Sequence, residues 1–93
     1  MKAWQLLKEK GWCRRTYARN GNGTPVHWTS EFAVSFCAIG AITKVSRSGT
    51  RASFKQNVVE LLLPKGQRNL GAWNDDPKRT KAEVIALLKK ANV

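Results

Sequence analysis

The sequence is poor in the residues that acid–base and metal chemistry require. Its 93 residues include a single histidine, His27, six acidic residues and two cysteines, Cys13 and Cys37. Catalytic and metal sites are built from clusters of these residue types. The two cysteines form no CxxC pair and have no metal-ligand spacing to His27, which excludes a zinc site of known pattern and a disulfide framework. We therefore expect no cofactor, no metal and a reducing, cytoplasmic environment.

Long apolar runs are also absent. The longest weakly charged stretch, residues 31–42, is too short and too interrupted to span a bilayer. Residues 1–10 lack the continuous apolar region of a signal peptide. We therefore expect no membrane association. A chain of this length corresponds to one small domain covering residues 1–93.

The shortage of acidic residues leaves a large positive charge. Seventeen lysines and arginines against six acids give a net charge of +11 and an isoelectric point near 10.4. Such a surplus favours polyanionic partners, which include nucleic acid, nucleotides and acidic protein surfaces. The alternative is that the charges only keep the surface solvated.

Residues 31–42 form the predicted centre of the fold. At helical spacing this stretch is apolar on nearly every side, which is typical of a buried helix. Thr29 or Ser30 is predicted to cap its beginning. Gly40 would destabilise an exposed helix by about 1 kcal/mol relative to alanine, so its presence indicates close packing of another backbone.

The flanking segments predict three further helices, and the fold class is therefore mainly α (α+β), with about four helices around a buried central one. One helix covers residues 2–10. A second covers residues 51–63, with Thr50 as a plausible N-cap. Its apolar residues are predicted to face the core: Phe54, Val58, Leu61 and Leu62. The last helix begins at Thr80-x-x-Glu83, a capping box, and residues 67–73 before it are predicted to be irregular.

Residues 12–28 predict a small N-terminal β-hairpin around the Asn-Gly-Asn-Gly turn at 20–23. Its first arm carries three arginines beside Trp12 and Tyr17: Arg14, Arg15 and Arg19. Cations mixed with aromatic rings are typical of surfaces that hold phosphates and stack bases. The same pattern also fits a half-buried strand with one solvated face.

The connection at residues 44–55 is the best single candidate for an anion site. It has no acidic residue and four cations: Lys44, Arg47, Arg51 and Lys55. A helix is predicted to begin within it, and free N–H groups at a helix N-terminus attract phosphate. The alternative is a solvated loop between helices.

Two motifs give the sequence a family resemblance. Phe36-Cys-Ala-Ile-Gly-Ala41 resembles an aromatic-Cys-x-x-Gly-Ala signature, and the segment from Trp73-Asn-Asp to Arg79-Thr80 and Glu83-Val84 resembles a second one. In this order they resemble a family of small uncharacterised bacterial and bacteriophage proteins. The resemblance implies a mainly helical domain in the cytosol of a bacterium or of a phage-infected bacterial cell, and it assigns no activity, cofactor or catalytic residue.

We expect a small basic, non-catalytic protein that binds RNA, DNA or a nucleotide through the hairpin arginines and the 44–55 connection. The first alternative is a phage-type inhibitor or adaptor that docks on an acidic surface of a host protein. The second is a cysteine-dependent enzyme with Cys37 as nucleophile, His27 as base and Asp75 as orienting residue. An apolar helix around Cys37 disfavours the thiolate that such an enzyme needs.

Overall fold

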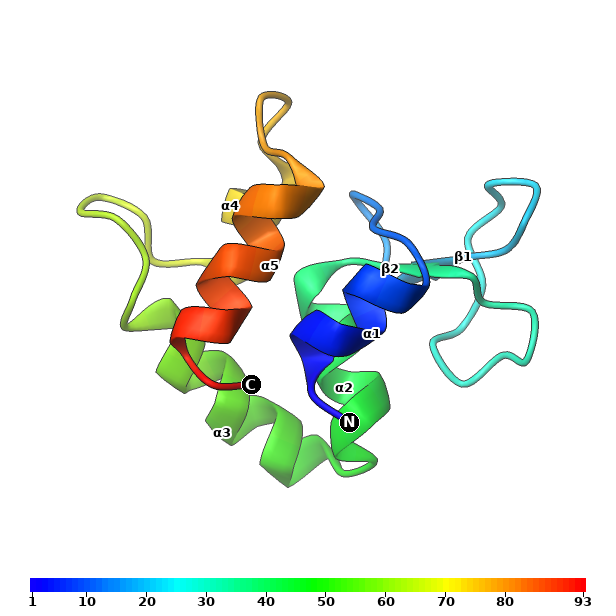
Figure 1. Cartoon of the computed structure of the whole chain (residues 1–93), viewed down its shortest axis with the longest axis horizontal. Coiled ribbons are helices and arrows are strands. Elements are labelled where there is room, and N and C mark those ends of the chain that lie inside the picture. Colours follow the sequence, from blue (N-terminus) through cyan, green and yellow to red (C-terminus); the bar gives the residue numbers. More distant parts are fainter.

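A computed structural model describes all 93 residues and contains five helices and one two-stranded antiparallel sheet (Figure 1). In chain order the elements are α1 (Ala3–Glu9), β1 (Ala18–Arg19), β2 (Ser35–Phe36), α2 (Ala38–Ser46), α3 (Gly49–Glu60), α4 (Leu70–Asp75) and α5 (Lys81–Lys90). The predicted mainly α class with a small β-hairpin is confirmed. No helix has both the length and the apolar character needed to cross a membrane.

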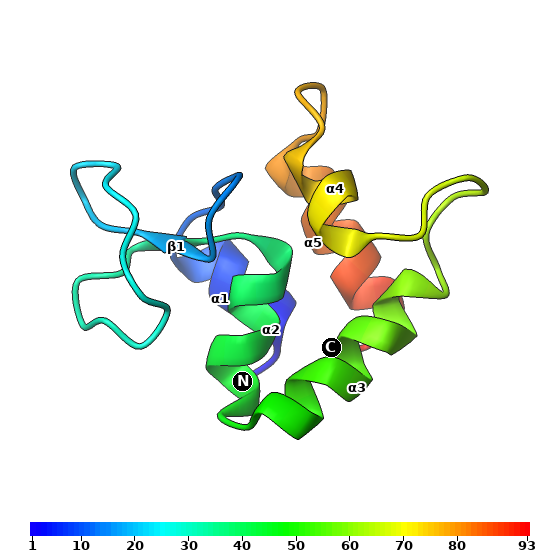
Figure 2. The same ribbon diagram turned by 180° about the vertical axis from the view of Figure 1, so that it is seen from behind.

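Helix α2 lies at the centre of the fold. It packs against α1, α3 and α4, and α1 packs in turn against α5 (Figures 1 and 2). Phe36, just before α2, and Ile42, in the middle of it, are among the most deeply buried side chains. The predicted role of this stretch as the core of the fold therefore holds for its second half.

The first half of the central stretch is not helical, which corrects the predicted start of the helix. The N-cap of α2 is Cys37, whose Sγ accepts a hydrogen bond from the Gly40 N–H at 3.2 Å, and neither Thr29 nor Ser30 has this role. Residues 35–36 pair instead with β1, in the register Ala18 opposite Phe36. An apolar run satisfies a strand as well as a helix, and pairing with a distant segment decides between them.

Phe32 precedes this strand and is 67% exposed, although it was predicted to contribute to the buried helix.

The predicted turn at residues 20–23 is present, but the main strand partner of β1 is β2 and not the segment that directly follows the turn. The side chain of Asn20 accepts hydrogen bonds from two backbone N–H groups within the turn, and Gly23 has the positive φ of 81° that such turns favour. The returning arm makes only an isolated bridge between Arg19 and Pro25. Strand β1 therefore pairs mainly with β2, across the loop of residues 20–34.

Gly40 provides the close approach that the sequence predicted. A Cβ atom at this position would overlap the carbonyl oxygen of Tyr17, a backbone atom that cannot rotate away. The same carbonyl accepts a hydrogen bond from the Cys37 N–H at 3.1 Å. The missing side chain thus lets the first turn of α2 lie directly against the segment before β1.

Asn74 connects three parts of the chain through its fully buried amide. Its Oδ1 accepts hydrogen bonds from the Trp12 ring nitrogen at 2.7 Å and from the Ala38 N–H at 3.0 Å. Its Nδ2 donates to the Cys13 carbonyl and to the Asp75 carboxylate, both at 3.1 Å. The Trp-Asn-Asp motif therefore has a structural role, because it joins α4 to the start of α2 and to the segment before β1.

Residues 67–73 were predicted to be irregular, and helix α4 corrects this prediction for residues 70–73. Asn69 caps it by accepting a hydrogen bond from the Ala72 N–H at 2.9 Å. The following helix, α5, begins at the predicted capping box of Thr80 and Glu83. The predicted buried stripe of α5 is also present, with Val84 and Leu88 at its centre.

Helix α3 turns a different face to the core from the one that its sequence predicted. Its buried residues are Ala52 and Val59, whereas Phe54 is 71% exposed and Leu61, just after the helix, is 85% exposed. Small Ala52 lets α3 approach its neighbours closely, and hydrophobic periodicity gives more weight to the larger residues on the opposite face. The prediction of a buried Phe54 and Leu61 is wrong.

Candidate anion-binding site

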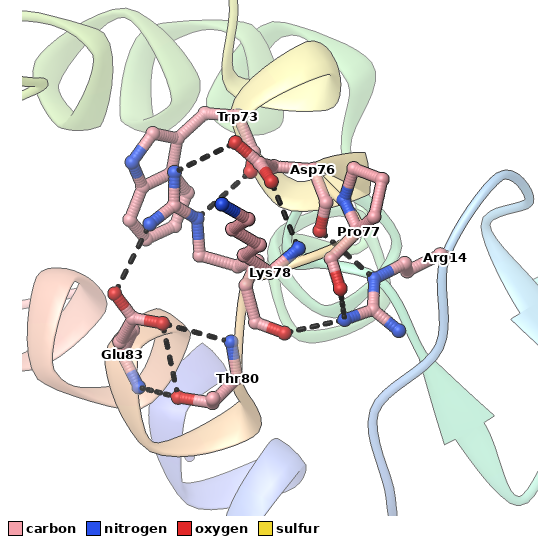
Figure 3. A network of polar contacts seen from close by, with 8 residues as sticks. Arg14, Trp73, Asp76, Pro77, Lys78, Thr80 and Glu83 are labelled. Atoms are coloured by element: carbon pink, nitrogen blue, oxygen red, sulfur yellow. Dashed lines mark hydrogen bonds and ion pairs between the residues drawn. The ribbon is translucent and has the colours of Figure 1, made fainter.

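Two of the three hairpin arginines hold backbone groups of this chain. The Arg14 guanidinium donates to the carbonyl of Asp76 at 3.2 Å and also to those of Pro77 and Arg79 (Figure 3). It lies 4.5 Å from the centroid of the Trp12 ring. Arg19 donates to the carbonyls of Gly23 and Arg14, at 2.9 and 3.0 Å. These two side chains tie loops together.

Arg15 is the third hairpin arginine, and its side chain makes no hydrogen bond or ion pair. Its backbone is left-handed, with φ of 68°, and its N–H donates to the Asp75 carboxylate at 2.9 Å. A hollow of about 440 Å³ lies here, lined by all three hairpin arginines together with Asp75. The carboxylate and the engaged arginines leave this hollow with one free cation, so it is the weaker candidate for an anion site.

Three of the four cations predicted in the 44–55 connection meet around one larger hollow, of about 570 Å³. We call it the corner pocket, and its lining residues are Met1, Leu6, Trp28, Lys44, Val45, Ser46, Arg47 and Arg51. Its lining comes from the end of α2, the start of α3, the N-terminal residues and Trp28. Figure 1 shows the N-terminus beside the turn between α2 and α3. Lys55 is one helical turn beyond Arg51 on α3 and does not line it.

The short turn between α2 and α3 brings the three cations together. Arg47 caps the end of α2 with a left-handed backbone (φ of 56°), and its N–H donates a hydrogen bond to the Thr43 carbonyl at 3.1 Å. The next residue, Ser48, caps α3 in place of the predicted Thr50. Arg47 and Arg51 are thus separated by one cap and a single helical turn. The N-terminal N–H groups of α3 lie at the same place.

No carboxylate neutralises the corner pocket. Both ion pairs of the molecule belong to Arg79, which contacts Glu83 at 3.1 Å and Asp76 at 4.0 Å (Figure 3). Four of the six acids accept hydrogen bonds from backbone N–H groups elsewhere: Glu60, Asp75, Asp76 and Glu83. No acidic residue is among those that line the pocket, so its three cations have no carboxylate partner there.

Trp28 gives the pocket an aromatic wall. Each of the other tryptophans carries a cation of this chain over its ring: Arg14 over Trp12, Arg79 over Trp73 and Lys89 over Trp4. Trp28 instead stacks on His27, with the ring centroids 5.3 Å apart, and is half-buried. No cation of this chain lies over the Trp28 ring, and Trp28 lines the same pocket as three cations that have no ion-pair partner.

Ser46 adds an unsatisfied polar group to the lining. Its side chain is only 5% exposed, and its Oγ has no hydrogen-bond partner. A buried hydroxyl without a partner destabilises the folded state by roughly 1–3 kcal/mol. The Oγ atom itself has almost no solvent-accessible surface, so Ser46 lines the pocket without offering its hydroxyl to it.

The residues of the hypothetical cysteine enzyme make other contacts. Burial raises the pKa of the Cys37 thiol to about 11, so the thiol is protonated at neutral pH. His27 Nδ1 lies 2.6 Å from the Thr29 hydroxyl, and the Asp75 carboxylate accepts the hydrogen bonds described above. No group of three or more His, Cys, Asp and Glu side chains is placed to hold a metal ion.

The sequence predicts the cations of the corner pocket but not the other residues that line it. Trp28, Leu6 and Met1 come from segments that only the tertiary fold places beside α2. Ser46 was read as part of a polar connection, and its burial depends on the packing of its neighbours.

The sequence comparisons place the chain in a family. The chain belongs to a family of unknown function (DUF6197), which matches residues 1–92. This confirms the resemblance to an uncharacterised family. No curated protein and no solved structure matches the chain.

Proposed function

We propose that this member of an uncharacterised family is a non-catalytic binding protein whose corner pocket takes a phosphate-bearing ligand, either RNA or DNA or a free nucleotide. One observation carries the proposal: Lys44, Arg47 and Arg51 converge on a single hollow without any carboxylate to pair with. Three unpaired cations at one place repel one another, and an anion between them relieves that repulsion.

The chemistry of the lining suits a phosphate with an aromatic base attached. Arginine guanidinium groups bind phosphate oxygens with two parallel hydrogen bonds, and the α3 N-terminus offers further N–H donors. Stacking of a base on an aromatic side chain contributes roughly 1–3 kcal/mol. Trp28 lines the same hollow as the three cations, which supports such a contact. A volume of about 570 Å³ is within the range of pockets that hold a small ligand.

Salt-dependent binding of a labelled single-stranded oligonucleotide tests the proposal. The affinity is measured by fluorescence anisotropy for oligo(dT) and oligo(U) between about 50 and 200 mM salt, where each phosphate contact contributes a slope of about −0.7 for single strands. The double variant R47Q/R51Q is expected to bind roughly 10- to 100-fold more weakly. Its slope of log affinity against log salt should be less steep by about 1.4, which corresponds to two phosphate contacts. A mononucleotide titration by calorimetry separates a free nucleotide from a strand as the preferred ligand.

A matched control removes the same charge elsewhere. Lys10 and Lys78 are exposed and their side chains have no polar partner, so K10Q/K78Q lowers the net charge by two without touching the pocket. Its affinity should fall only a few-fold, through the long-range field. Equal losses in the two double variants, or no binding by the unmodified protein at low salt, would overturn the proposal.

A further inference from the structure

The outward face of α3 carries an apolar stripe that no part of this chain covers. Phe54, Val58 and Leu61 recur at i, i+4 and i+7, so they line up along one side of the helix. Phe54 is 71% exposed, Leu61 is 85% exposed, and Val58 between them is half-buried. Figures 1 and 2 show α3 at the edge of the molecule, with the core on one side only. Single exposed apolar residues are normal, whereas a row of large ones indicates an interaction surface.

The stripe ends in a concavity. Beyond the end of α3, a hollow of about 630 Å³ opens between the last turn of the helix and the following loop. Leu61, Leu63 and Pro64 are its apolar lining, and the rest of the lining is polar backbone or side chain: Asn57, Glu60, Lys65, Gly66, Gln67 and Arg68. A hollow at the end of an apolar row accepts a large anchoring side chain, which is how helix-in-groove interfaces are fixed in register.

The charges around the stripe are almost all positive. Arg51 and Lys55 come from α3 itself, and Lys65 and Arg68 come from the loop that lines the hollow. The single acid of this region is Glu60, whose carboxylate accepts a hydrogen bond from the Leu70 N–H at 2.8 Å. The surface therefore presents an apolar row between cations.

We propose that this face, which we call the α3 face, docks an acidic amphipathic helix of a partner protein. The apolar side of that helix would cover Phe54 and Leu61, and its flanking carboxylates would meet Lys55, Lys65 and Arg68. Charge complementarity selects the acidic partner. A second copy of this chain fits poorly, because a two-fold contact would bring the same cations together in molecules of charge +11 each. A flat anionic bilayer would leave the hollow unfilled.

Synthetic peptides of about 16 residues test the proposal, since a helix of this length covers the whole of α3. The first peptide carries leucines at i, i+3, i+4 and i+7 with glutamates on its flanks. The second has the same composition in scrambled order, and the third replaces the glutamates by lysines. Binding is followed by the anisotropy of a label on each peptide. The acidic amphipathic peptide should bind, and the other two should bind at least tenfold more weakly.

Two variants locate the binding. Because Phe54 and Leu61 are exposed, F54Q/L61Q should fold normally, which its thermal unfolding checks, and should lose at least tenfold in affinity for the acidic peptide. R47Q removes a cation that lines the corner pocket and belongs neither to the stripe nor to its hollow, so it should leave peptide binding unchanged while it weakens oligonucleotide binding. Failure of the corner pocket and failure of the α3 face are thereby distinguishable.

Several results would overturn the α3 proposal. These are equal binding of the scrambled peptide, equal binding by F54Q/L61Q, or no binding of the acidic peptide up to roughly 1 mM. Light scattering that shows a dimer lost in F54Q/L61Q would assign the face to a second copy. Sedimentation with phosphatidylglycerol vesicles that is lost in the same variant would assign it to a membrane surface.

Discussion

At the scale of single residues, Asn74 uses both lone-pair positions of its oxygen and both protons of its nitrogen inside the core. We expect N74A to destabilise the protein by about 3 kcal/mol, because it leaves the Trp12 ring N–H and the Ala38 N–H without partners. Urea unfolding measures the change. The exposed Asn57 provides the control, since N57A should change the free energy of unfolding by less than about 0.5 kcal/mol. A loss below about 1 kcal/mol for N74A would contradict the structural role of the motif.

Arg47 combines an unfavourable backbone conformation with a place in the corner pocket. A non-glycine residue with a left-handed backbone destabilises the folded state by roughly 1 kcal/mol, which glycine avoids. We therefore expect R47G to raise the melting temperature by a few degrees, as about 1 kcal/mol does for a domain of this size. The same variant should bind oligonucleotides more weakly.

R47Q is the comparison for this variant, because it retains the backbone strain and loses the charge. It should bind as weakly as R47G without the gain in stability. Unchanged oligonucleotide binding by both variants would show that Arg47 does not contact the ligand.

The cysteines should be unreactive in the folded protein. Burial raises the pKa of Cys37 to about 11 and that of Cys13 in the same direction, so the reactive thiolate is scarce at neutral pH. A thiol reagent such as DTNB should label both slowly until the protein is denatured. The variant C37A isolates the signal of Cys13. Rapid stoichiometric labelling of Cys37 in the native protein would revive the cysteine-enzyme hypothesis.

At the scale of elements, the capping box of α5 makes its stability depend on pH. The hydrogen bond from the Thr80 N–H, strengthened by the Thr80 hydroxyl and by Arg79, lowers the pKa of the Glu83 carboxyl from its ordinary 4.5. A depressed pKa contributes stability above the ordinary value, and this contribution is lost as the pH falls through the lower folded value. The stability difference between the wild type and E83Q should therefore be present at neutral pH and be lost in acid, as the pH falls below the ordinary value of 4.5 and through the lower folded value.

T80A removes the other half of the box and should destabilise the protein by about 1 kcal/mol at neutral pH. Equal stability of T80A and the wild type would show that the box contributes nothing. Equal stability of E83Q and the wild type at every pH would show only that the charge of Glu83 contributes nothing, because glutamine can accept the same hydrogen bond.

The elements that the sequence predicted best are those determined by local chemistry. The start of α5 follows from Thr80 and Glu83 alone, and the turn at residues 20–23 follows from its own asparagines and glycines. The start of α2 could not be predicted in this way. Residues 35–36 become a strand because β1 is available to pair with them, and no feature near them in the sequence indicates that partner. The buried face of α3 depends in the same way on its neighbours.

The candidate site likewise has one part that local sequence predicts and another part that depends on the tertiary fold. Lys44, Arg47 and Arg51 are neighbours in the sequence, so the helix turn that gathers them could be predicted. The grouping of the hairpin arginines with them is not seen, because Arg14 and Arg19 bind loop carbonyls and line a different hollow. The aromatic wall at Trp28 depends on where the loop of residues 20–34 lies, which only the fold determines.

At the scale of the whole molecule, the charge of +11 is held within dimensions of 35 × 29 × 18 Å. The Debye length is about 30 Å at 10 mM salt and about 8 Å at 150 mM, so at low salt every cation repels every other. We expect the free energy of unfolding in urea to rise when sodium chloride is increased between these concentrations. Sodium sulfate at equal ionic strength should stabilise further if the corner pocket takes an anion, and R47Q/R51Q should lose this additional part. Stability independent of salt would contradict the repulsion.

The hydrogen bonds of Asn74 also bear on the order of events in folding. They join residues 36 to 62 positions apart in the chain, so large loops must close before any of them can form. Contacts of this kind commonly form after the transition state, and their loss then accelerates unfolding more than it slows folding. The hydrogen bonds of Asn74 would then determine mainly the unfolding rate, and so the lifetime of the native state. Helices such as α5 are expected to form early, because their signals are local in the sequence.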